Sequence, residues 1–215
     1  IGVYDKASDS YVLYSGSQGA GGLRDRVARV VGVENTKVRV VTPDVGGGFG
    51  MKAGAYPEQA LVLIAAKITG RPVRWSSDRT EAFLTDQHGR DTCTKAEIAL
   101  DKDGKILAVR VTGTANMGGY MTFFAPFIPT LAGGRILGGV YRVPNLFVNI
   151  KGYFSNTAPV NAYRGAGRPE AAYMMERLMD AAAAKTGIDR VELRKRNLIT
   201  PEELPYKNWW GIPYD

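Results

Sequence analysis

A chain of 215 residues, 45% hydrophobic and 23% charged, has the composition of a globular protein that buries a core. Its longest apolar run, residues 60–66, is too short to span a bilayer, and its one cysteine excludes an internal disulfide or a cysteine-held metal cluster within the chain. The formal charge of +7 fits an acidic partner, but equally a solvated basic surface. The single cysteine fits a reducing, cytoplasmic compartment. Because the chain starts without methionine in a strand-like pattern, we expect it to be a piece of something larger.

The first 80 residues alternate between strand-like and helix-like patterns. Apolar residues that recur at helical spacing end at Gly32, and Pro57 with Glu58 is typical of the first turn of a helix. The helix after Pro57 is apolar on almost all sides, so we expect it to be buried. The predicted elements are strands at residues 10–17, 37–41 and 72–77 and helices at residues 23–31 and 57–69.

The chain from residue 92 predicts a long antiparallel hairpin that turns at Asp103 and Gly104. We expect an irregular, glycine-rich and aromatic loop at 118–140, a strand at 146–156, a helix from Pro169 to Gly187, and a short helix that ends near Asn197. With no internal repeat and no evident linker, residues 1–215 are predicted to form a single domain. Its fold class is α+β, a mixed α/β unit with parallel and antiparallel pairing.

Two glycine-containing turns, at residues 46–50 and 164–167, each lie between a predicted strand and a predicted helix. The first N–H groups of a helix have no partner in the helix and attract anions, and glycine lets an anion approach the backbone. Arg164 adds a planar, permanently charged group in the second turn. The alternative is that both turns only close the core, with Arg164 in an ordinary salt bridge.

A phosphate-binding P-loop does not fit the first turn, because Met51 precedes Lys52 and Ala53 follows it. A dinucleotide-binding fingerprint fits better, with Gly48, Gly50 and Ala53 as G-x-G-x-x-A and Asp78 at the place of the ribose acid. An NAD-type dehydrogenase domain is therefore the main alternative function. A basic scaffold or nucleic-acid-binding module ranks last, because the basic residues are scattered along the chain.

The ordered motifs as a set are more specific. GGGFG, GRPV with DR, NAYRGAGRPEA, MERLMD, ELRKRNLI and a closing PY…YD follow one another over nearly the whole chain. This order resembles the molybdenum-binding large subunits of the xanthine dehydrogenase, aldehyde oxidase and aerobic carbon monoxide dehydrogenase family. The resemblance implies the first molybdopterin-binding domain of such a subunit.

The resemblance also implies which residues form the site. Gln18 matches a glutamine that hydrogen-bonds near the oxo or water ligand of molybdenum. Gly48, Phe49 and Gly50 match the stretch whose backbone touches the pterin, and Arg164 matches an arginine that approaches the pterin or orients substrate. Gln18, Phe49 and Arg164 are the expected catalytic set. The cofactor's sulfurs hold the metal in this family, so no protein ligand to it is expected.

Two positions depart from the better-known members of that family. Gly165, which we include among the cofactor-contacting residues, occupies the place where carbon monoxide dehydrogenases have a cysteine. Ala53 occupies the place of a glutamate that recognises purines. The resemblance therefore supports neither carbon monoxide nor purine oxidation.

The implied reaction is hydroxylation of an aldehyde, N-heterocycle or related small molecule, with water as the oxygen source. The implied cofactor is molybdopterin with molybdenum, as a cytosine dinucleotide, with 2Fe–2S centres and FAD on other domains or subunits. The expected partners are the remaining domains of the molybdenum subunit, the iron–sulfur and flavin subunits, and a small-molecule substrate. No nucleic acid and no membrane span are expected, and the general base, a glutamate, is expected outside this chain.

Overall fold

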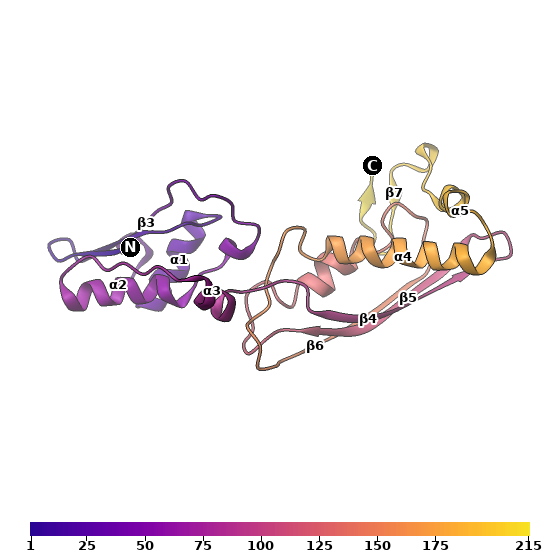
Figure 1. Cartoon of the computed structure of the whole chain (residues 1–215). Coiled ribbons are helices and arrows are strands. Elements are labelled where there is room, and N and C mark those ends of the chain that lie inside the picture. The colour runs from indigo at the N-terminus through magenta and orange to yellow at the C-terminus, as the bar shows by residue number, and fades with distance from the viewer. The chain divides into compact units, whose positions relative to one another are not determined.

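The computed structural model describes residues 1–215, which form two compact units (Figure 1). The first unit contains residues 1–88 and 162–164, and the second contains residues 89–161 and 165–215. No helix has the length and apolar character that crossing a bilayer requires.

The first unit is built on a three-stranded sheet in the order β1-β2-β3. β1 (Gly2–Asp5) pairs antiparallel with β2 (Ser10–Tyr14), and β2 pairs parallel with β3 (Val38–Val41). Tyr11 and Leu13 alternate toward the core, where they pack with Leu23 and Val27 of α1 (Ala20–Val31) and Leu63 of α2 (Pro57–Thr69). Three short helical segments complete this unit: η1 (Asn35–Lys37), η2 (Met51–Ala53) and α3 (Arg79–Thr85).

The structure confirms the helices at α1 and α2 and the strands at β2 and β3, with ends shifted by a few residues. Gly32 and Gly70 end the two helices in the left-handed conformation, at φ 80° and 64°. The strand expected at 72–77 is wrong, because only Val73 pairs there, in an isolated bridge with Gly2. The short helix α3, whose N-cap is Asp78, was not predicted from the sequence.

Helix α2 is less buried than its apolar sequence predicts. Leu63 and Ala66 are completely buried, but Leu61 is 59% exposed and Ile68 is 79% exposed. One side of the helix packs on β1 and the core, and the other side has no cover from this chain.

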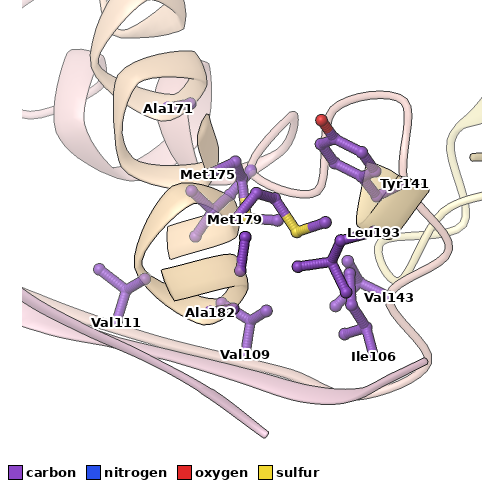
Figure 2. Packing of buried hydrophobic residues seen from close by; sticks show 12 residues of the cluster. Ile106, Val109, Val111, Tyr141, Val143, Ala171, Met175, Met179, Ala182 and Leu193 are labelled. Atoms are coloured by element: carbon purple, nitrogen blue, oxygen red, sulfur yellow. The ribbon is translucent and has the colours of Figure 1, made fainter. Parts of the chain in front are cut away.

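The second unit contains a sheet in the order β4-β5-β6, made of β4 (Thr92–Leu100), β5 (Ile106–Asn116) and β6 (Leu146–Tyr153). The first pair is antiparallel and the second is parallel. Figure 2 shows the core between this sheet and α4 (Arg168–Thr186), where Val109 and Val111 face Met175 and Met179. The remaining elements are η3 (Ile128–Ala132), α5 (Arg190–Asn197), η4 (Pro201–Glu203) and a hairpin of β7 (Tyr206–Lys207) and β8 (Pro213–Tyr214).

The predicted hairpin, the strand at β6, and the helices α4 and α5 are confirmed. The irregular segment at 118–140 contains one ordered piece that the sequence analysis did not predict, the π-helical turn η3. The mixed α/β class with both kinds of pairing is also confirmed. The small separate sheets differ from the open parallel sheet that a dinucleotide-binding dehydrogenase domain requires.

Candidate functional site

The glycine loop after β3 contacts a distant part of the chain within the first unit. The backbone N–H of Arg164 donates to the carbonyl of Phe49 at 2.9 Å. Gly50 lies so close to Ala162 that a Cβ built on Gly50 would overlap the carbonyl oxygen of Ala162 and lie 2.8 Å from its carbonyl carbon. At φ 97°, Gly50 also has a conformation that L side chains rarely adopt. Glycine at this position therefore brings residues 162–164 against the loop.

Gln18 is attached to the same loop at two points. Its backbone N–H donates to the carbonyl of Lys52 at 3.0 Å, and its Oε1 accepts from the backbone N–H of Gly50 at 2.7 Å. Because an N–H can only donate, this bond fixes the orientation of the carboxamide and directs Nε2 away from Gly50. A Cβ on Gly48 would overlap the Gln18 side chain, so Gly48 makes the room that Gln18 occupies.

Phe49 is exposed and has an uncommon backbone conformation. It has a positive φ of 53°, which is uncommon for a residue with a bulky side chain, and it is 52% exposed. The guanidinium of Arg164 lies over its ring at 5.8 Å from the centroid, a cation–π contact. The structure thus brings four of the six predicted site residues into contact, directly or through Gly50, and places Gly48 beside Gln18.

The sequence pattern suggested that the first glycine loop leads into the N-terminus of a helix, but in the structure it does not. The 3-10 turn η2 follows the loop, and α2 begins only at Pro57. Tyr56 ties this connection to the loop through a hydrogen bond from its hydroxyl to the carbonyl of Met51 at 3.1 Å. Gln59 ties it to the residue that follows β2, since its Nε2 donates to Ser15 Oγ at 2.9 Å. The prediction of an anion-binding helix start at this loop is therefore wrong.

The second glycine turn does lead directly into a helix. Gly167 is the N-cap of α4, with φ 95°, and Gly165 and Ala166 before it also have positive φ, 94° and 44°. A Cβ on Gly165 would lie 2.5 Å from Pro169 Cδ, so any side chain at this position, a cysteine included, would be strained. Gly165 lies in the second unit and Arg164 in the first, so the convergence of both turns on one cavity stays a prediction.

The first unit also contains a cavity whose lining residues were not predicted as a site. This cavity, of about 380 Å³, is lined by side chains that include Ser15, Lys52, Glu58 and Asp86. Burial raises the pKa of the Asp86 carboxyl above its ordinary value. The sequence offered little indication of this cavity, because Lys52 is the one residue of these four that lies close to a recognised motif, GGGFG.

Comparison with known proteins identifies the family. The sequence profile described as "Molybdopterin cofactor-binding domain" matches residues 1–198. The chain belongs to this family. It is the molybdopterin-binding domain of the xanthine dehydrogenase, aldehyde oxidoreductase and carbon monoxide dehydrogenase large-subunit group.

Individual relatives agree with this assignment. The domain is 36% identical to the carbon monoxide dehydrogenase large chain of Hydrogenophaga pseudoflava, over 100% of this chain and 27% of that protein. It is 36% identical to the 6-hydroxypseudooxynicotine dehydrogenase complex subunit gamma of Paenarthrobacter nicotinovorans, over 84% of this chain and 22% of that one. The structure of quinoline 2-oxidoreductase from Pseudomonas putida 86 superposes with a TM-score of 0.94 at 32% identity, over 99% of this chain and 27% of that chain. The domain thus spans about a quarter of the length of these relatives.

Proposed function

We propose that this domain binds molybdopterin as part of a molybdenum hydroxylase large subunit, and that Gln18, residues 48–50 and Arg164 form its contacts. The observation that carries the proposal is the convergence of these residues within the first unit. Together they offer an oriented amide donor, bare glycine backbone and a guanidinium, a donor set that suits an anionic cofactor. The residues present therefore fit the group that the family implies.

Each residue has a separate role in this proposal. Gln18 donates from Nε2, whose direction is set by the bond from Gly50 to Oε1. Phe49 presents a half-exposed aromatic face on which a flat substrate can pack. Arg164 orients an anionic or carbonyl-bearing group, and its position depends on its backbone bond to Phe49. Gly165, in the second glycine turn, contacts the cofactor through its backbone.

The remaining parts of the proposed enzyme lie outside this chain. When bound, the molybdenum cofactor supplies two-electron oxidation of substrate with oxygen from water. We propose that the cofactor is the cytosine dinucleotide form, that the general base is a glutamate elsewhere in the subunit, and that 2Fe–2S and FAD carriers lie on other domains or subunits. The contribution of this chain is to bind the cofactor and to hold a donor and an aromatic wall beside it.

The substrate class is an aldehyde, an N-heterocycle or a related small molecule. Two relatives are named for nitrogen heterocycles or their derivatives, a quinoline and a pseudooxynicotine, and this supports the N-heterocycle class. Gly165 argues against carbon monoxide as the substrate. The family resemblance associates that substrate with a cysteine at this position, and the turn at Gly165 has no room for a side chain without strain. Ala53 likewise lacks the carboxylate that resemblance associates with purines.

The test uses the intact enzyme that contains this chain. Its molybdenum content, the nucleotide released by acid hydrolysis, and its turnover of aldehydes, N-heterocycles and carbon monoxide are measured. Gln18→Ala is expected to lower kcat/KM roughly 10- to 100-fold, the factor that one hydrogen bond to a charged group represents. Asn149→Ala, which changes an exposed amide on β6, is the control and is expected to have no effect. A wild-type enzyme without molybdenum would refute the proposal.

The isolated chain of residues 1–215 is expected to contain no stoichiometric molybdenum and to have no activity, because the family resemblance places much of the cofactor site outside it. Metal analysis of the purified chain checks this expectation. A molybdenum content near one per chain would show that residues 1–215 hold the cofactor without the rest of the subunit.

A further inference from the structure

Lys52, the middle residue of η2, contacts the glycine loop and the segment around Gln18 through both its backbone and its side chain. Its Nζ donates to the carbonyl of Val45 at 2.8 Å, and its backbone N–H donates to the carbonyl of Gly48 at 3.3 Å. Its backbone carbonyl accepts from the N–H of Gln18 at 3.0 Å. The stem of the side chain lies beside Gly16, where a built Cβ would be 3.7 Å from Lys52 Cδ.

The loop that Lys52 closes has a high conformational cost. Gly46, Gly47 and Gly50 have φ values of 66°, 101° and 97°, and Phe49 has a positive φ as well. Glycine loses more conformational freedom on folding than any other residue, so a loop with this composition orders poorly without bonds across it. The bond from Lys52 Nζ to Val45 joins the two ends of this loop.

Gln18 depends on the loop for its direction. Both of its bonds go to residues 50 and 52, one from the backbone and one to Oε1. If the loop loosens, the carboxamide loses its fixed orientation, and Nε2 no longer donates in one direction. The bond of the Lys52 ammonium and both bonds of Gln18 thus belong to the same loop.

We propose that Lys52 is a positioning residue, whose ammonium bond to Val45 holds the glycine loop and so fixes the direction in which Gln18 donates to the cofactor. This inference rests on the proposed function. The side chain of Lys52 lines the 380 Å³ cavity with Ser15, Glu58 and Asp86, and the lining of that cavity does not include Gln18, Phe49 or Arg164. This separation favours a role through the loop over direct contact with the cofactor.

The experiment compares four forms of the intact holoenzyme. Lys52→Met removes the ammonium and keeps the stem beside Gly16, and Lys52→Arg keeps a donor for Val45. Lys6→Met is the matched control, because Lys6 is an exposed lysine in the same unit, remote in sequence from the loop. Iron and flavin contents show whether each variant has assembled.

Two readouts are taken, neither of which needs a substrate. Hydrogen exchange of peptides that cover residues 15–19 reports the bond from the Gln18 amide to Lys52, and the EPR spectrum of Mo(V) after reduction with dithionite reports the surroundings of the metal. We expect Lys52→Met to exchange about tenfold faster at Gln18, which corresponds to about 1.4 kcal/mol, and to show an altered Mo(V) spectrum. Lys52→Arg and Lys6→Met are expected to match the wild type.

The outcomes separate this inference from the function on which it rests. A wild-type enzyme with no molybdenum would refute the proposed function and the inference with it. A wild-type Mo(V) spectrum in Lys52→Met would overturn the inference alone. The inference would also be overturned by an altered spectrum with unchanged exchange at residues 15–19, since Lys52 would then act directly, or by the same change in Lys6→Met.

Discussion

Replacement of Gly50 with alanine tests the packing that holds the candidate site together. Two costs add in this variant. An L residue at φ 97° and ψ −36°, outside the left-handed helical region, costs about 1–3 kcal/mol in backbone strain. The new Cβ also overlaps the carbonyl oxygen of Ala162, so residues 162–164 must move away and lose the bond from Arg164 to Phe49, which costs about 1 kcal/mol. We therefore expect a loss of about 2–4 kcal/mol in the free energy of unfolding.

The matched control is Gly46→Ala in the same loop. Gly46 also has a positive φ, 66°, but a Cβ there would meet nothing within 4 Å. Only the backbone strain applies, so we expect a loss of about 1–2 kcal/mol. Urea denaturation of the two variants measures the difference, and for a chain of this size each kcal/mol also lowers Tm by roughly 2–4 °C. Equal losses from Gly50→Ala and Gly46→Ala would refute the close approach of residue 50 to Ala162.

Three further predictions concern function, stability and pH. Gly48→Ala is expected to cost little stability, because the exposed Gln18 side chain can rotate away from the new Cβ, but to lower kcat/KM of the intact enzyme about as much as Gln18→Ala does; unchanged kinetics would contradict the placement of Gln18. Tyr141→Phe removes the 2.7 Å hydrogen bond to Glu176 from a buried ring and is expected to cost about 1 kcal/mol, measured by urea denaturation, whereas no loss would show that this bond contributes nothing net. Burial raises the pKa of Asp86, so its charged carboxylate opposes folding at pH values above the ordinary pKa of 3.8. Asp86→Asn is therefore expected to leave the free energy of unfolding unchanged below that pH and to increase it above that pH. A difference in the free energy of unfolding that does not vary with pH would contradict this prediction.

Local patterns predicted most of the secondary structure. The helical spacing of Leu23 and Val27, with glycine at the C-terminus, was enough to predict α1, and the alternation on both sides of Asp103 and Gly104 was enough to predict the hairpin. Each of these signals lies within a few residues of the element that it specifies. The capping pattern of Asp78 and Glu81 was also present, but the dinucleotide-binding alternative had assigned Asp78 to a ribose, and α3 was missed.

The arrangement of the site depends on contacts that local patterns do not contain. The sequence motifs selected Gln18, Phe49 and Arg164 through a family resemblance, and no periodicity could show that Gly50 packs against Ala162. The reason for the glycines also changed. The sequence interpretation assigned them to the approach of a cofactor, whereas in the structure Gly48 makes room for Gln18 and Gly50 makes room for residues 162–164. The approach of a cofactor to the same backbone remains part of the proposal.

The exposed side of α2 shows a second limit of sequence patterns. An apolar helix predicts burial but does not say which chain buries it. Here Leu61 and Ile68 are exposed within residues 1–215, while Leu63 on the other side is completely buried. Composition alone gave the same prediction for both sides.

A density map of the intact holoenzyme with its cofactor tests the central claim most directly. The account predicts a pterin in contact with the backbone of residues 48–50, and a ligand of the metal or an atom of the pterin at about 3 Å from Gln18 Nε2, a hydrogen-bond distance. A cofactor bound elsewhere, with Gln18, Phe49 and Arg164 facing solvent or another protein segment, would contradict it.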